Sequence, residues 1–342
     1  MMPTERTRVL VVDDSAFARK VLREILASSA ELEVVGFARD GLEALEKIAE
    51  LRPDVVTLDL VMPNLDGLGV LRALGAGQGP RFVVASVSDA ESALVIEALQ
   101  MGAVDFVHKP TALATERLYE LGGELIAKVI AAGQARVRPA AVAAATRLAH
   151  AAPGTVRLVV VGTSTGGPQA LTRLLTALPA DMPCAVAVAL HIPAGYTDAL
   201  ARRLNDSSAV EVFEASQGAA LRPGSVAIAR GGLHMRVRRE GDQLVTHVGA
   251  TPTSAPFCPS VDVLFESAVT AVGSAVLGVV LTGMGTDGVE GARAISRAGG
   301  RTLTESEASC VVYGMPRAVK EAGLSAGEAR IEDMAAAIVT RL

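Results

Sequence analysis

Short apolar runs alternate with amphipathic stretches through the first 125 residues of the chain. The runs have the length of strands and are rich in Val, Leu and Ile, whereas the stretches between them repeat their apolar positions every three or four residues. Strands are predicted at residues 8–12, 54–60, 81–85 and 103–107, and helices at residues 15–26 and 41–51. Strands and helices in this alternating order are typical of a doubly wound α/β domain with a parallel sheet.

The same alternation restarts at residue 157. Apolar strands are predicted directly before residue 162 and at residues 184–190 and 275–281, each followed by a helical stretch. A β-hairpin is predicted between them, from residues 226–237 and 243–248 around Gly241. This half of the chain therefore predicts a second doubly wound parallel sheet with a β-hairpin insertion.

The segment between the two halves has a different composition. Residues 131–152 hold eleven alanines and show no patterned apolar face, which is typical of a linker, although an Ala-rich surface helix would have the same composition. Residues 1–125 carry a net charge of −8, residues 126–155 one of +4 and residues 156–342 one of −1. We therefore predict domains at 7–125 and 156–342, joined by a basic linker at 126–155. Neither domain has a basic surplus, which argues against a nucleic-acid partner.

Composition narrows the class of protein further. Half of the 342 residues are hydrophobic, which excludes intrinsic disorder and allows large cores. No apolar run approaches the roughly 20 residues of a membrane span, and no secretory signal is evident, so no membrane insertion is expected. The three cysteines are scattered, which is unlike a disulfide framework or a zinc site, and a reducing, cytoplasmic location is expected.

Polar residues mark the ends of the predicted strands in the first domain. Asp13 and Asp14 follow the first strand, Asp59 lies at the end of the second, and Ser86 and Lys109 follow the last two. Because ligands bind at the carboxyl ends of parallel strands, we expect these side chains to converge. Three carboxylates in one place repel each other and favour a hard divalent cation, Mg²⁺ above all. A carboxylate between Mg²⁺ and an ammonium can attack a phosphoryl group, because both cations stabilise the transferring oxygens.

These residues stand in motifs that resemble the receiver domain of two-component response regulators. The resemblance is carried by "VLVVDDSAFAR", "VVTLDLVMPNLDG", Ser86 and "DFVHKP". It implies a flavodoxin-like fold and phosphorylation of Asp59 by a histidine kinase. It also implies that the Ser86 hydroxyl contacts the phosphoryl group, that Lys109 is its cationic partner and that Phe106 moves on activation. Mg²⁺ would be bound by the three carboxylates, those of Asp13, Asp14 and Asp59.

A glycine-rich turn, GTSTGGP, follows the first strand of the second domain. It leaves Ser164 exposed before a predicted helix, a pattern that presents a nucleophile but more often cradles a phosphate or only makes the turn. His191 and Asp287 follow the next two strands, so parallel pairing would bring all three residues to one edge. The serine could attack there, with the histidine taking its proton and the carboxylate orienting the imidazole. His234, in the predicted hairpin, is the alternative base.

Motifs in this half resemble the catalytic domain of chemotaxis protein-glutamate methylesterases, the CheB family. They are "GTSTGGP", "HIPAGYT", "RPGSVAIARGGLHM", "PSVDVLF", "LTGMGTDG" and "CVVYGMP", and the resemblance spans nearly all of residues 156–325. It implies a Rossmann-like fold and a triad of Ser164, His191 and Asp287, with a backbone N–H of Met284 donating to the oxyanion. No cofactor is expected in this domain.

The same resemblance implies a phosphorylation-regulated serine hydrolase. Such an enzyme removes methyl groups from glutamate γ-methyl esters of chemoreceptors and releases methanol, and some members also deamidate receptor glutamines. Within the family an unphosphorylated receiver covers the catalytic cleft, and phosphorylation shifts that docking equilibrium. A phosphate sink or scaffold with an inactive second domain is disfavoured by the complete Ser–His–Asp set. A transcriptional regulator is disfavoured because the second domain has no basic helix-turn-helix.

Overall fold

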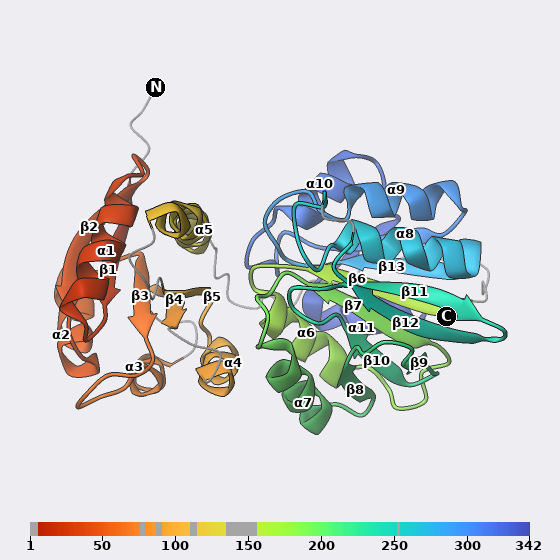
Figure 1. The fold of residues 1–342 in the computed structure, drawn as a ribbon, viewed down its shortest axis with the longest axis horizontal. Coiled ribbons are helices and arrows are strands. Elements are labelled where there is room, and N and C mark those ends of the chain that lie inside the picture. Colours follow the sequence, from red (N-terminus) through yellow and green to blue (C-terminus); the bar gives the residue numbers. More distant parts are fainter. Residues whose placement is uncertain (1–5, 76–78, 87–90, 110–114, 135–155, 252–253) are drawn as a thin grey trace. The chain divides into compact units, whose positions relative to one another are not determined.

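The computed structural model describes residues 6–75, 79–86, 91–109, 115–134, 156–251 and 254–342. The chain divides into two compact units, Met1–Val137 and Arg138–Leu342. Figure 1 shows that each unit contains a sheet with helices on both of its faces. The predicted fold class, two doubly wound α/β domains with parallel sheets, is confirmed.

The sheet of the first unit has five parallel strands in the order β2-β1-β3-β4-β5. They are β1 (Thr7–Val12), β2 (Leu32–Ala38), β3 (Val55–Asp59), β4 (Arg81–Ser86) and β5 (Asp105–His108). The helices are α1 (Ala16–Ala27), α2 (Gly41–Leu51), α3 (Gly67–Leu74), α4 (Ser92–Gln100) and α5 (Thr115–Gln134). The hydrophobic pattern does not predict β2, because this edge strand fully buries only its first and last residues.

Short polar side chains begin the first three helices of this unit. Each accepts a hydrogen bond from the backbone N–H three residues further on, and so satisfies a donor that the first helical turn leaves without a partner. The capping residues are Ser15 in α1, Asp40 in α2 and Asp66 in α3. Each cap ends the loop that joins a strand to the next helix. The loops are therefore short, and their acidic residues stay at the edge of the sheet.

Helix α5 crosses the boundary that the composition predicts at residue 125. It continues to Gln134, and Leu125, Val129 and Ala132 on its inner face are buried. Residues 126–134 therefore belong to the first unit and not to a linker, because their apolar side chains complete its core. The rest of the predicted linker, residues 135–155, lies outside the described residues.

The main sheet of the second unit has seven parallel strands in the order β15-β14-β13-β6-β7-β10-β8. They are β6 (Leu158–Thr163), β7 (Ala185–Leu190), β8 (Glu211–Glu214), β10 (Ser225–Ile228), β13 (Val276–Val280), β14 (Arg301–Glu305) and β15 (Gly327–Ala329). The α-helices are α6 (Gly167–Thr176), α7 (Thr197–Ser207), α8 (Val261–Val272), α9 (Val289–Arg297), α10 (Met315–Glu321) and α11 (Ile331–Val339). Strands β6, β7 and β13 are buried along their whole length, so their sequences are continuous apolar runs.

A small antiparallel sheet forms the insertion, but its hairpin differs from the predicted one. Strands β11 (His234–Glu240) and β12 (Gln243–Gly249) pair around Gly241 as expected, and β9 (Ala220–Leu221) pairs with β12. Residues 225–228, however, form β10 in the main sheet, so the predicted first strand at 226–237 is wrong in its first part. No strand runs through Gly231, where a Cβ would lie 2.3 Å from the Pro193 carbonyl oxygen. That close approach separates β10 from the hairpin.

Candidate functional sites

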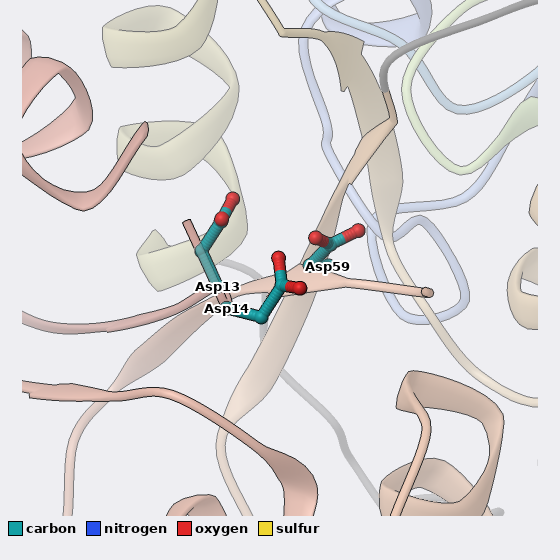
Figure 2. Close-up of side chains that lie close together, drawn as sticks. All are labelled: Asp13, Asp14 and Asp59. Carbon is teal, nitrogen blue, oxygen red and sulfur yellow. The ribbon is translucent and has the colours of Figure 1, made fainter. Parts of the chain in front are cut away.

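Three carboxylates come together at the carboxyl edge of the first sheet. Asp13 follows β1 and Asp59 ends β3, and these strands are neighbours in which Val12 pairs with Leu58. Oxygen atoms of Asp13, Asp14 and Asp59 lie within 4.8 Å of one another. Figure 2 shows the three side chains close together. Asp13 and Asp59 are buried, whereas Asp14 is exposed. Carboxylate oxygens at this spacing suit a hard divalent cation such as Mg²⁺.

Lys109 supplies a positive charge inside this acidic cluster. Its Nζ lies 2.8 Å from Asp13 Oδ2 and 2.6 Å from Asp59 Oδ2, and the lysine side chain is buried. Burial raises the pKa of Asp59 above its ordinary value, while the charge of Lys109 and its hydrogen bond oppose that rise. Three carboxylates and one ammonium leave an excess of negative charge, which a bound divalent cation would offset.

The other two residues predicted in this unit lie on neighbouring strands. Ser86 ends β4 and pairs with His108 of β5, but its side chain lies outside the described part of the structure. Phe106 is buried in β5, and Lys128 of α5 donates to its carbonyl oxygen at 2.7 Å. Lys128 Nζ also lies over the Phe106 ring, 5.3 Å from its centroid. Phe106 is therefore connected to α5, a contact that no sequence motif indicates.

Ser164 lies in a tight turn between β6 and α6. Its N–H donates to the Thr282 carbonyl oxygen at 3.1 Å, and its carbonyl oxygen accepts from Gly167 N–H at 2.7 Å. Gly166 has a φ of +78°, a left-handed conformation that favours glycine. A Cβ on Gly283 would lie 2.9 Å from Ser164 Cβ, so the loop after β13 can approach the serine only with glycine there. The glycines of both motifs thus place Ser164 at the sheet edge.

His191 leaves the sheet beside Ser164. Thr163 of β6 pairs with Leu190 of β7, so the residues that follow them emerge from adjacent strands at the same level. His191 Nε2 lies 2.7 Å from Asp287 Oδ2, while its Nδ1 is buried without a hydrogen-bond partner in the described part of the chain. When Nε2 carries the proton toward the carboxylate, Nδ1 carries the lone pair of the neutral imidazole. Nδ1 is therefore the nitrogen available to Ser164 Oγ. No hydrogen bond joins the two side chains among the described residues, and such bonds are often long in free enzymes.

Asp287 lies in the loop between β13 and α9, and its carboxylate accepts four hydrogen bonds. The donors are His191 Nε2, Val261 N–H at 2.7 Å, Asp262 N–H at 2.9 Å and Ser260 Oγ at 3.1 Å. Burial alone would raise the pKa of Asp287, but the hydrogen bond and charge of His191, with the two backbone donors, hold it below its ordinary value. Asp287 is thus a carboxylate that stays ionised beside the histidine. The three residues predicted at this edge are brought together.

Met284 follows Gly283 in the loop beside Ser164. The Gly283 carbonyl oxygen accepts from Gly314 N–H at 3.1 Å and from Met315 N–H at 2.8 Å, which fixes this loop. Among the described residues, the Met284 N–H has no acceptor. It is a backbone donor one residue after Gly283, the residue that approaches Ser164, and is therefore a candidate donor for an oxyanion.

His234 and Phe257 are two further aromatic residues that bear on the role of His191. The alternative base, His234, is buried on β11 and its Nδ1 accepts from Ser260 N–H at 3.2 Å, so its position indicates a structural role. Phe257 instead stacks on the catalytic candidate, with its ring centroid 4.1 Å from that of His191 and an interplanar angle of 12°. Phe257 is 39% exposed. Sequence reasoning missed it, because a single aromatic residue in a loop carries no periodic or motif signal.

Comparisons with known proteins give the family of each unit. Residues 159–338 match the family described as CheB methylesterase, and residues 9–120 match the response regulator receiver domain. A protein-glutamate methylesterase/protein-glutamine glutaminase of Myxococcus xanthus is 63% identical over 96% of both chains, and one of Symbiobacterium thermophilum is 45% identical over 97% of this chain and 96% of its own. The catalytic domain of a Thermotoga maritima CheB methylesterase superposes with a TM-score of 0.53 and 32% identity, covering 54% of this chain and 98% of that domain.

The acidic cluster and the Ser–His–Asp edge define the class of protein: a response regulator whose second unit is an enzyme. A receiver unit carries the first site, and a hydrolase unit carries the second. The chain belongs to the CheB methylesterase family.

Proposed function

We propose that the chain hydrolyses γ-glutamyl methyl esters of chemoreceptors, that it deamidates receptor glutamines, and that phosphorylation of Asp59 controls both activities. The observation that carries the proposal is the 2.7 Å contact between His191 and Asp287, at the sheet edge that also presents Ser164. The names of the two relatives supply the substrate class. A hydroxyl, an imidazole with a free ring nitrogen and an ionised carboxylate are the groups that acyl transfer requires.

Ser164 and His191 carry the bond-making steps in this proposal. Ser164 Oγ attacks the ester carbonyl carbon, and His191 Nδ1 takes the hydroxyl proton. The imidazolium gives this proton to the methoxy oxygen, the carbon–oxygen bond breaks and methanol leaves, so the glutamyl group is held on Ser164 as an ester. Water then attacks that ester and gives a proton to Nδ1, which passes it to Ser164 Oγ as glutamate departs. With a glutamine, ammonia leaves in place of methanol and the acyl intermediate is the same.

Asp287 and Met284 stabilise the charges that arise in these steps. The Asp287 carboxylate faces Nε2 and stabilises the imidazolium that forms at each proton transfer. The Met284 N–H would donate to the oxyanion of each tetrahedral intermediate. Loss of one such donor costs roughly 10²–10³ in kcat in serine hydrolases.

The receiver unit would accept a phosphoryl group on Asp59. Asp13, Asp14 and Asp59 together fit Mg²⁺, which when bound neutralises charge on phosphoryl oxygens. Lys109 holds Asp59 in place and supplies a second positive charge. The phosphodonor would be the histidine kinase of the chemotaxis pathway, and the receptor would be the substrate of the second unit.

A cytoplasmic location fits these two partners. In the described residues, no helix is both long enough and apolar enough to cross a membrane. The three cysteines are free, and two of them, Cys184 and Cys310, are buried. Unpaired thiols of this kind suit a reducing compartment.

Release of methanol from methylated receptor membranes tests the proposal. The purified full-length chain is assayed with and without a small phosphodonor. Ser164→Ala is expected to lose at least ~10⁴-fold in kcat with an unchanged circular dichroism spectrum, because it removes one triad member. Ser207→Ala, which removes a hydroxyl from exposed helix α7, is the matched control and should keep full activity. A Ser164→Ala chain with a tenth of the activity would overturn the assignment of the nucleophile. A wild-type chain that takes up phosphate but releases no methanol would support the scaffold alternative.

A further inference from the structure

The first turn of helix α8 is capped by Asp287, a residue of the loop that leads into α9. Asp287 lies two residues before α9, yet its carboxylate accepts the N–H groups of Val261 and Asp262, the first two residues of α8. These N–H groups are donors that the helix itself leaves unsatisfied, and they carry the positive end of its dipole. The carboxylate that faces His191 is therefore anchored on the start of α8.

The start of helix α9 is in turn capped by a residue of α8. Asp262 Oδ1 accepts from Gly288 N–H at 2.9 Å and from Gly291 N–H at 2.7 Å, and Gly288 directly follows Asp287 in the chain. Asp287, just before α9, thus accepts from the start of α8, and Asp262, within α8, accepts from the start of α9. The loop that carries Asp287 is tied to α8 from both sides.

The two helices approach each other closely at this crossing. They lie side by side in Figure 1, and a Cβ on Gly291 would lie 2.5 Å from Phe265 Cβ and 3.2 Å from Asp262 Cα. Gly288 has a φ of +103°, which only glycine adopts without strain. The close packing at Gly291 and the restricted conformation of Gly288 fix the position of α9 on α8. The hydrogen bonds of Asp262 and Asp287 therefore depend on this one arrangement of the two helices.

Charge is divided unequally between the two carboxylates. Burial raises the pKa of Asp262 to about 6, and the nearby charge of Asp287 adds to that rise, although the two glycine N–H groups oppose it. The pKa of Asp287 is held low by His191 and by the backbone donors. The negative charge of the pair is therefore most stable on Asp287, on the side of His191.

We propose that Asp262 is a positioning residue of the active site: by capping α9 it holds Asp287 where its carboxylate meets His191 Nε2. The inference rests on the proposed triad. Without the Asp262 side chain, Gly288 N–H and Gly291 N–H lose their acceptor and the loop between β13 and α9 is released. A displacement of about 1 Å at a catalytic group can cost ~10²-fold in rate, and the loss falls on kcat because the substrate-binding surface is unchanged.

Steady-state methanol release by the full-length chain tests this role with two variants of Asp262. Asp262→Ala should lower kcat by roughly 10²-fold and change KM by less than about 2-fold. Asp262→Asn keeps Oδ1 as the acceptor for both glycines and should restore kcat to within about 3-fold of wild type. Asn205→Ala is the matched control for a lost acceptor. Asn205 Oδ1 accepts a 3.0 Å hydrogen bond from Val212 N–H, and this bond lies outside the active site. Glu266→Gln, on the exposed face of α8, is the control for a lost charge.

A double-variant cycle separates positioning from general destabilisation. If Asp262 acts through Asp287, then Asp262→Ala should cost nothing further in an Asp287→Ala background, measured with tritium-labelled methyl groups to reach low rates. An equal loss in both backgrounds, or a kcat for Asp262→Ala like that of Asn205→Ala, would overturn the proposal. Should Asp262→Ala fail to fold, Asp262→Glu takes its place, because it keeps the acceptor but displaces it by one methylene and should also lower kcat. Ser164→Ala is assayed in parallel: activity there would refute the triad, whereas its loss together with an unaffected Asp262→Ala refutes only the positioning role.

Discussion

Glu305 is a buried carboxyl group behind the nucleophile turn, and Glu305→Gln is expected to stabilise the protein at neutral pH. Its side chain is 1% exposed at the end of β14. Oε2 accepts from Thr282 N–H at 2.8 Å and Oε1 accepts from Ser309 Oγ at 2.9 Å. Glutamine keeps the acceptor for Thr282, and its amide can donate to Ser309 Oγ, whose own proton can turn to the Ser306 carbonyl oxygen at 3.4 Å. The substitution therefore removes a charge and keeps a hydrogen bond to both Thr282 and Ser309.

The magnitude follows from the cost of ionising this group in the folded protein. Burial raises the pKa of Glu305 from 4.5 to about 6, although the Thr282 and Ser309 hydrogen bonds oppose the rise. At about 1.4 kcal/mol per pH unit, the ionised side chain costs roughly 2 kcal/mol of folding free energy. The folded state holds its proton more tightly than the unfolded state, so the cost is absent below pH 4.5 and grows as the pH rises. It is complete above about pH 6.

Calorimetry of the full-length chain between pH 4 and pH 8 measures this effect as a difference between wild type and Glu305→Gln. Above about pH 6, the transition of the second unit should rise by roughly 4–8 °C in the variant, and the difference should vanish toward pH 4. Glu307→Gln, at an exposed position two residues further on, is the matched control and should follow the wild-type curve. A difference that does not change with pH would refute the reasoning, because the gain would then come from a source other than the ionisation of Glu305.

Three more outcomes are expected. Phe257→Ala should lower kcat about 2- to 10-fold in the methanol assay, because the ring that stacks on His191 is lost, whereas Phe257→Tyr should retain activity. Lys109→Met should destabilise the first unit by about 3–5 kcal/mol in urea titrations, since it leaves buried carboxylates without their cation, and added Mg²⁺ should restore part of the loss. Asp59→Asn should abolish stimulation by a small phosphodonor and keep basal activity; stimulation that persists would place the phosphoryl group elsewhere.

The parts of the fold that follow from the sequence are the buried parallel strands. Strands such as β6 and β13 are mostly apolar because both of their faces are covered, so the polar residues at their ends are visible in the sequence. The convergence of Asp13 with Asp59, and of Ser164 with His191, follows from the rule that parallel strands end at one edge.

The features that the sequence does not reveal depend on tertiary contacts. The edge strand β2 is only partly buried and has no clear pattern. The ring stacking of Phe257 and the crossed caps of Asp262 and Asp287 join residues far apart in the chain, and no local periodicity encodes such a contact. Only the structure shows which ring nitrogen of His191 is free, because the sequence indicates the base but not the ring atom that faces the carboxylate.

The two sites occupy equivalent sheet edges but balance negative charge in different ways. In the first unit, strand ends bring Asp13 and Asp59 against Lys109, side chain to side chain, and the surplus of carboxylates suits a cation and then a phosphoryl group. In the second unit, Asp287 meets His191 and the N–H groups at the start of α8, so an imidazole and backbone donors stabilise its charge. His191 can then gain and lose a proton beside a carboxylate that keeps its own ionisation state. On the proposed function, the partner that each carboxylate meets suits one edge to accepting a phosphoryl group and the other to relaying protons.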